Sequence, residues 1–134
     1  SGTLYVRGAT FADNYSFTSG SPTIGGGSTI EYASTTTNQT IRRSLAYQSL
    51  NISGAMTKTV DSAVSISADL NVYGGTLDLS SYLADNAGGT LTVSSGATLK
   101  IGGTNLLNKY YTTNFGSAQI GAMFYVSWVV EAWK

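Results

Sequence analysis

The sequence predicts an all-β fold, namely a parallel β-solenoid or β-helix-like stack of short strands, with an antiparallel β-sandwich as the alternative. Three observations lead to this prediction. Short runs recur in which two apolar residues flank one polar residue, which is the period of a strand with one buried and one wet face. Clusters of turn-forming residues separate these runs. No ten-residue window shows a convincing helical period of 3.6 residues.

The strand pattern begins near the N-terminus, where Leu4 and Val6 flank Tyr5, and it recurs along the chain. The turns between the runs are rich in glycine, which adopts the positive φ values that sharp bends require. Residues 41–49 are the best helix candidate, but their apolar stripe is only partial, so we assign them to strand and turn. The predicted strands cover residues 2–6, 28–32, 48–52, 64–66, 68–72, 75–79, 89–93 and 97–101.

The spacing of the strands fits both architectures. From Leu70 to Leu99, successive strands begin 7, 14 and 8 residues apart, which is short enough for neighbouring faces of a solenoid coil. A sandwich also has short strands at intervals of about 8–12 residues. Spacing alone therefore does not choose between the two.

A longer similarity links the two ends of the chain. The run Gly-Thr-Leu-x-Val, followed by Gly-Ala-Thr, occurs in residues 2–10 and again in residues 89–98, at an offset of 87 to 88 residues. A connector rich in Tyr, Phe, Asn and Thr follows each copy. We predict a single β domain over residues 1–134, organised as one repeat of about 88 residues (1–88) and part of a second (89–134). The alternative is chance similarity in a chain rich in Gly and Thr.

The composition excludes several classes of function. The chain has 7 Lys and Arg against 7 Asp and Glu, so it lacks the basic excess that binds nucleic acid or anionic lipid. It has no Cys and no His, which removes thiolate nucleophiles, zinc–thiolate sites and the Ser-His-Asp triad. No apolar run approaches the roughly 20 residues of a membrane-spanning helix. We expect a protein that is not an enzyme, needs no cofactor and does not insert into a membrane.

Carboxylates are the main catalytic groups that remain. Asp69 and Asp78 occupy polar positions of nearby predicted strands and are the candidate pair for cutting sugar chains. The alternative is a charge on the wet face that serves solubility. Asp85 and Asn86 precede two glycines and could offer oxygens to Ca²⁺, but a plain turn explains them better, and we predict no metal site.

Aromatic side chains are the strongest candidates for contact with a ligand or partner. Several lie in predicted loops beside Asn and Thr, a composition suited to stacking on sugars or anchoring a partner. The alternative is that they cover the open side or ends of the sheet. These candidates are Tyr15, Phe17, Tyr110, Tyr111 and Phe115.

Two further features have a functional interpretation and a simpler alternative. Arg42 and Arg43 are adjacent basic residues that could bind an acidic polymer, or could form a solvated corner. The segment 122–133 is the most hydrophobic of the chain, and we expect it to form a strand that is buried against another subunit or repeat. The residues of this candidate assembly strand are Phe124, Val126, Trp128 and Val130.

About two-thirds of the chain resembles repeats of very large cell-surface proteins of gliding and related Bacteroidetes bacteria. The resemblance rests on residues 28–32, 39–41, 50–54, 58–60, 70–72 and 75–79, with 89–103 fitting the same pattern. Filamentous-haemagglutinin-like and autotransporter-like β-helical passengers are similar more loosely. The resemblance implies an exported adhesin or filament segment of stacked β-coils without an active site. It also gives weight to O-glycosylation at Ser62, because Asp61-Ser62-Ala63 fits the short motif that Bacteroidetes use on exported proteins.

Together these observations predict a non-enzymatic structural or adhesive segment of a secreted or cell-surface protein, located outside the cell. We expect it to assemble into a fibre or tandem array, with itself or adjacent repeats as partners, and surface polysaccharide as a further partner. The alternative is a carbohydrate-binding or carbohydrate-cleaving β-helical module.

Overall fold

The computed structural model describes residues 1–17, 22–80, 82, 84–85, 89–101, 111–112 and 119–120. The chain divides into two compact units, Ser1–Gly103 and Thr104–Lys134. In the second unit, β13 (Tyr111–Thr112) pairs with β14 (Gln119–Ile120) in antiparallel fashion. All other described strands belong to the first unit.

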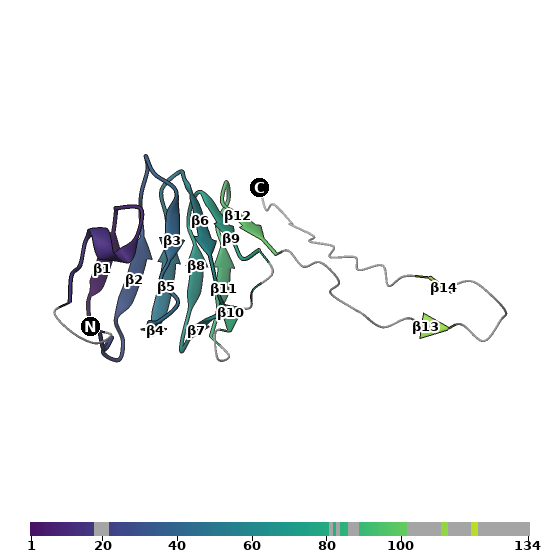
Figure 1. The fold of residues 1–134 in the computed structure, drawn as a ribbon, viewed down its shortest axis with the longest axis horizontal. Coiled ribbons are helices and arrows are strands. Elements are labelled where there is room, and N and C mark those ends of the chain that lie inside the picture. Colours follow the sequence, from purple (N-terminus) through teal and green to yellow (C-terminus); the bar gives the residue numbers. More distant parts are fainter. Residues whose placement is uncertain are drawn as a thin grey trace, which may run out of the picture. The chain divides into compact units, whose positions relative to one another are not determined.

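The first unit is a parallel β-solenoid with three sheets (Figure 1). Every strand pair in these sheets is parallel, which confirms the solenoid and excludes the antiparallel sandwich. The five-stranded sheet contains β1 (Thr3–Val6), β2 (Thr29–Tyr32), β5 (Ser49–Ile52), β8 (Leu70–Val72) and β11 (Leu91–Val93). The four-stranded sheet contains β3 (Gln39–Ile41), β6 (Thr57–Val60), β9 (Thr76–Asp78) and β12 (Thr98–Lys100). The three-stranded sheet contains β4 (Ala46–Tyr47), β7 (Val64–Ile66) and β10 (Ala84–Asp85).

Three coils, β2–β4, β5–β7 and β8–β10, each contribute one strand to each sheet, and the sequence pattern sets the register between coils. In the five-stranded sheet, Ile30, Leu50, Leu70 and Leu91 are direct partners at intervals of 20, 20 and 21 residues. These residues form one inward-facing row because direct partners in neighbouring strands point to the same face of the sheet. Burying each such side chain contributes about 1.5–3 kcal/mol, so like residues stacked on like build a continuous core.

The predicted strands correspond well to the observed ones. Each predicted run contains an observed strand, and residues 41–49 are the end of β3, a turn and β4, as expected. The list of predicted strands lacked β3, β4, β6 and β10. The strands β4 and β10 have two residues each, which is too short to show an alternation. The two similar runs at either end of the chain form β1 and β11 of one sheet, and the 88-residue repeat stays a prediction.

Glycines with positive φ form the corner between the five-stranded and four-stranded sheets. Gly54, Gly75 and Gly96 follow β5, β8 and β11, with φ values of 73°, 66° and 79°. The chain packs closely at this corner, since a Cβ on Gly75 would overlap the carbonyl oxygen of Gly54 and lie 2.6 Å from that of Met56. Only glycine combines this conformation with this close approach.

Two polar side chains occupy inward-facing positions of the four-stranded sheet. Gln39 is 2% exposed, and its amide donates to the carbonyl oxygens of Val6 and Gly8 at 2.9 and 2.7 Å. Lys58 is 0% exposed, and its ammonium donates to the carbonyl oxygens of Ser34 and Met56 at 3.1 and 2.9 Å. No buried side-chain nitrogen or oxygen in the described ranges lacks a hydrogen bond. The core therefore has a fully bonded polar layer, which costs far less than an unpaired one.

The burial of Lys58 predicts a pH dependence of stability. Burial lowers the pKa of Lys58 from its ordinary 10.5. Between the lowered pKa and 10.5, the unfolded state binds more protons than the folded state, so the free energy of unfolding rises with pH. For a single group the slope within this window cannot exceed about 1.4 kcal/mol per pH unit. Urea unfolding from pH 7 to 10 should therefore show a steeper rise for the native sequence than for Lys58→Met, and parallel profiles would contradict the assignment.

Candidate binding site at the N-terminal cap

A short segment after β1 covers the N-terminal end of the solenoid. It contains the 3-10 helix η1 (Phe11–Asp13), whose Phe11 is 1% exposed. The Asp13 carboxylate accepts hydrogen bonds from the backbone N–H and the hydroxyl of Thr10, at 2.6 and 3.0 Å. The side-chain oxygen of Asn14 accepts from the backbone N–H groups of Arg7 and Gly8, at 2.7 and 2.8 Å. Short polar side chains thus hold this cap in place.

The cap also covers the edge of the four-stranded sheet. The backbone N–H of Thr40 in β3 donates to the carbonyl oxygen of Ala9 at 2.9 Å, and Gln39 reaches the same segment from within the core. At the edge of the five-stranded sheet, the hydroxyl of Tyr15 donates to the carbonyl oxygen of Tyr5 at 3.0 Å. At this end, one backbone N–H of β3 and one carbonyl oxygen of β1 therefore have partners from the chain itself, which opposes pairing with another chain at these points.

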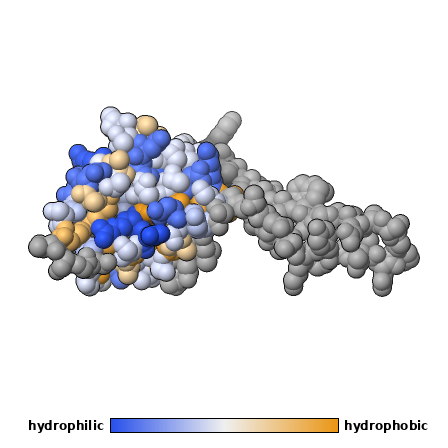
Figure 2. Space-filling view, viewed as in Figure 1, coloured by the Kyte–Doolittle hydropathy of each residue, from blue (hydrophilic) through white to orange (hydrophobic). Residues whose placement is uncertain are grey.

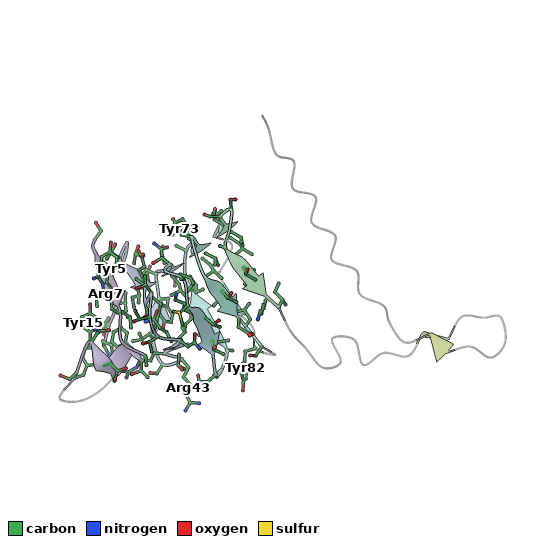
Figure 3. All side chains as sticks on the ribbon, turned by 90° about the horizontal axis from the view of Figure 1, so that it is seen from above. Tyr5, Arg7, Tyr15, Arg43, Tyr73 and Tyr82 are labelled. Atoms are coloured by element: carbon green, nitrogen blue, oxygen red, sulfur yellow. The ribbon has the colours of Figure 1, made fainter. Side chains whose placement is uncertain are left out.

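The two described aromatic candidates have different environments. Tyr15 is half-buried against the core, with its ring centroid 5.1 Å from that of Phe11, so it covers the end of the solenoid. Phe17 stacks on the other side of this cluster, 5.9 Å from Phe11 with 16° between the ring planes, and stays 42% exposed. Tyr5, Arg7 and Tyr15 gather at this end of the solenoid (Figure 3). Of the two candidates, Phe17 keeps a surface for contact with a ligand.

Arg42 and Arg43 lie in the turn between β3 and β4, beside the cap. A buried tyrosine pair fixes this turn from inside the core. The backbone N–H of Arg42 donates to the Tyr32 hydroxyl at 2.9 Å, and the Tyr47 hydroxyl donates to the Arg42 carbonyl oxygen at 2.7 Å. The two hydroxyls lie 3.1 Å apart. Burial raises the pKa of both tyrosines, so they remain neutral hydrogen-bonding groups well into the alkaline range.

The side chains of the two arginines differ in packing. The guanidinium of Arg42 lies over the rings of Phe11 and Phe17, 5.6 and 5.9 Å from their centroids, and its Nε donates to the Ser44 hydroxyl at 2.9 Å. Arg43 is exposed and projects away from the solenoid (Figure 3). Within the described part of the chain, neither arginine forms an ion pair. The corner is therefore partly packed rather than simply solvated.

A cleft of about 250 Å³ opens between the cap and this turn. Hydroxyl groups, both arginines and one carboxylate line it, over a floor that includes Phe11 and Ile41. The lining residues are Thr10, Phe11, Ala12, Thr40, Ile41, Arg42, Arg43, Ser44 and Asp61. This cleft brings guanidinium groups, hydroxyl groups and the ring of Phe11 together.

The structure does not bring the carboxylate pair together in a catalytic arrangement. Asp69 precedes β8 of the five-stranded sheet, and its carboxylate accepts from the backbone N–H of Thr90 in the next coil at 2.9 Å. Asp78 ends β9 of the four-stranded sheet, and its carboxylate accepts from the backbone N–H and the hydroxyl of Ser80, at 2.8 and 3.3 Å. The Asp69 carboxylate thus bonds across to the next coil beside the five-stranded sheet, whereas the Asp78 carboxylate bonds within the turn after its own strand in the four-stranded sheet. Their geometry fits turn and coil stabilisation.

Of the remaining predicted site residues, the structure describes only some. Ser62 lies in the turn between β6 and β7 and is half-buried. Asp85 is in β10 and Tyr111 in β13, and the structure gives no side-chain description of either. The other aromatic candidates and the candidate assembly strand lie outside the described residues. These are Tyr110, Phe115, Phe124, Val126, Trp128 and Val130.

The opposite end of the described solenoid is open. Along the inward-facing row of the five-stranded sheet, Leu50 is 1% exposed and Leu70 is 4% exposed, whereas Leu91 in β11 is 43% exposed. Ile101, directly after β12, is 61% exposed. Figure 2 shows a mostly hydrophilic or neutral face with smaller hydrophobic patches. Exposed apolar residues that are in register with the core therefore indicate a surface suited to contact with further protein.

Two groups of buried polar residues were not among the predicted site residues, although the strand alternation places them inside the solenoid. They are Lys58 and the pair Tyr32 and Tyr47. Lys58 alternates in phase with Val60, so the strand period places it inside, although its charge suggests the opposite. Tyr32 and Tyr47 also occupy inward positions, but nothing in the sequence indicates that their hydroxyls meet. Such contacts between coils depend on the register, which requires the fold.

No family model, curated protein or solved structure matches the chain. The resemblance to surface-protein repeats therefore stays a prediction. Among the residues that the structure describes, no cluster of acidic side chains could hold a metal ion, and no helix is long and apolar enough to cross a membrane.

Proposed function

We propose that the chain is a non-enzymatic structural segment of an exported surface protein, in which further coils stack on the β11–β12 end of the solenoid. The observation that carries this proposal is the contrast between the two ends. In the row of Leu4, Leu4 at the capped end is half-buried and Leu91 at the other end is 43% exposed; in the row of Val6, Val6 is 0% exposed and Val93 is half-buried. The location outside the cell rests on the sequence resemblance, and the non-enzymatic role rests on the absence of the common catalytic residue types.

The β11–β12 end has free sheet edges. Like the strands at the opposite end of each sheet, β11 and β12 each have a paired neighbour on one side only among the described strands. An edge strand offers backbone N–H and C=O groups to any strand that arrives in register. Leu91, with Leu70 beneath it in the same row, would be buried by the next coil. Stacking thus supplies both hydrogen bonds and apolar burial, as in other solenoids.

The closed end limits how such units combine. Head-to-tail growth into a fibre of separate chains needs two open ends, but the segment around η1 covers one of them. The geometry favours a tandem array, in which the following coils belong to the same protein. Separate copies of this chain would pair through their β11–β12 ends and stop at a dimer.

Sedimentation equilibrium of the whole chain tests this proposal. We expect a monomer–dimer equilibrium that Leu91→Lys weakens at least tenfold, because a charge on the edge opposes both pairing and burial. The matched control, Thr3→Lys, puts the same charge on an exposed side-chain position of β1 at the capped end and should leave the dissociation constant unchanged. A chain that remains monomeric at about 1 mM, where even weak pairs of about 4 kcal/mol associate, would overturn the proposal.

A further inference from the structure

The cleft beside the N-terminal cap is a second feature, and stacking at the β11–β12 end does not use it. Its lining contains two guanidinium groups and one carboxylate, from Arg42, Arg43 and Asp61. The local charge is therefore positive in a chain whose formal net charge is zero. Local excess of positive charge in a concave site attracts anionic groups.

The arginines are available for an anion. Arg42 uses its Nε for the Ser44 hydroxyl, which orients the guanidinium and leaves its terminal nitrogens without a hydrogen bond to any described residue. Arg43 makes no hydrogen bond or ion pair within the described ranges. Guanidinium groups bind carboxylates and sulfates through paired N–H donors, so two neighbouring arginines suit such a group.

The turn that carries the arginines is preorganised. The backbone of Arg42 is held through both its N–H and its carbonyl oxygen by the buried Tyr32 and Tyr47 hydroxyls. Its side chain packs on Phe11, which is itself buried. A binding group that is held before the ligand arrives loses less conformational entropy on binding.

The surroundings indicate a sugar rather than a bare anion. Phe17 lies outside the lining but next to the Arg42 guanidinium, and the exposed part of its ring, 42% of the residue, offers an apolar surface for a sugar ring that extends from the cleft. Thr10, Thr40 and Ser44 add hydroxyls to the lining. The cleft, at about 250 Å³, is smaller than the roughly 300–1,000 Å³ of sites for drug-sized ligands, which suits one unit of a longer chain.

We propose that this cleft binds an acidic sugar unit of a polysaccharide. The carboxylate or sulfate of the sugar pairs with Arg42 and Arg43, its ring packs against Phe17, and Asp61 accepts hydrogen bonds from its hydroxyls. This binding would make the segment adhesive as well as structural. It does not depend on stacking, because it involves the capped end of the solenoid, and either proposal can fail alone.

Calorimetric titration of the whole chain tests the site with four probes: an oligogalacturonide, a chondroitin sulfate oligosaccharide, a neutral xylo-oligosaccharide and inorganic sulfate. We expect one or both acidic oligosaccharides to bind. Binding of the oligogalacturonide would show that a carboxylate is sufficient, whereas binding of chondroitin sulfate alone, which carries both groups, would indicate that the sulfate is required. Arg43→Gln should weaken this binding at least tenfold, and Phe17→Ser should weaken it as well. Arg7→Gln, which removes an exposed arginine near Tyr5, should change the affinity less than twofold.

Three results would overturn the proposal. The first is absence of binding by both acidic oligosaccharides at millimolar concentration. The second is an affinity for the neutral oligosaccharide or for inorganic sulfate that equals the affinity for the acidic oligosaccharides. The first case would show that the charge is not recognised, and the second that the sugar is not recognised. The third is an equal loss with Arg7→Gln and Arg43→Gln, which would indicate unspecific attraction. Unchanged thermal unfolding of each variant shows that the fold is intact, and Arg43 is exposed, so its replacement should not affect it.

Discussion

Replacing Gly75 by alanine is expected to lower the free energy of unfolding by about 2–5 kcal/mol. The residue has φ of 66°, a conformation that costs a residue with a Cβ about 1–2 kcal/mol. The added Cβ would also overlap the carbonyl oxygen of Gly54 and lie 2.6 Å from that of Met56. Both obstacles are backbone atoms of the preceding coil, so relief requires the coils to separate at this corner.

Gly96→Ala is the matched control for this prediction. Gly96 occupies the equivalent corner one coil later, with φ of 79°, but a Cβ there would meet nothing within 4 Å. It should lose only the conformational part, about 1–2 kcal/mol. Urea unfolding followed by circular dichroism measures both variants. Equal losses would show that the coils are not in close contact at Gly75.

Replacing Leu50 by alanine is expected to lower the free energy of unfolding by about 2–5 kcal/mol, the usual range for a buried leucine. Leu50 is 1% exposed and lies between Ile30 and Leu70 in the inward-facing row. The solenoid has coils on both sides of it, so the cavity cannot close easily.

Leu91 supplies the comparison, because it lies in the same row but is 43% exposed. Leu91→Ala should cost no more than about 1 kcal/mol in the monomer, since much of its surface already meets water. Thermal and urea unfolding at low protein concentration distinguish the two positions. Similar losses for both variants would contradict a solenoid that is open at β11.

The sequence was informative wherever the strand period was long enough to read. The runs at Leu70 and Leu91 have alternating residues and clear turns, so their strands and inward faces were predictable from local chemistry. The stacking of Ile30 on Leu50 was not, because spacing fitted both a solenoid and a sandwich. Parallel pairing decides between them, and pairing is a contact between distant residues.

The candidate site was predictable only in part. Arg42 and Arg43 stand out in a chain with few charges, and Phe17 stands out as an aromatic residue in a loop. The packing of Arg42 and Phe17 on the ring of Phe11 depends on how η1 folds over the end of the solenoid. Asp69 and Asp78 formed a candidate pair because they occupy polar positions of nearby predicted strands, but Asp69 bonds to Thr90 of the next coil and Asp78 to Ser80, beside different sheets.

Spin-label distance measurement tests the central claim, that the β11–β12 end is the stacking surface, most directly. The chain has no cysteine, so a single Thr98→Cys or Thr3→Cys change gives one labelled site, at β12 or at capped β1. In the associated protein we predict short distances between chains, a few strand spacings of about 4.8 Å each, for the label at position 98 only. Short distances at position 3, or at neither position, would contradict the account.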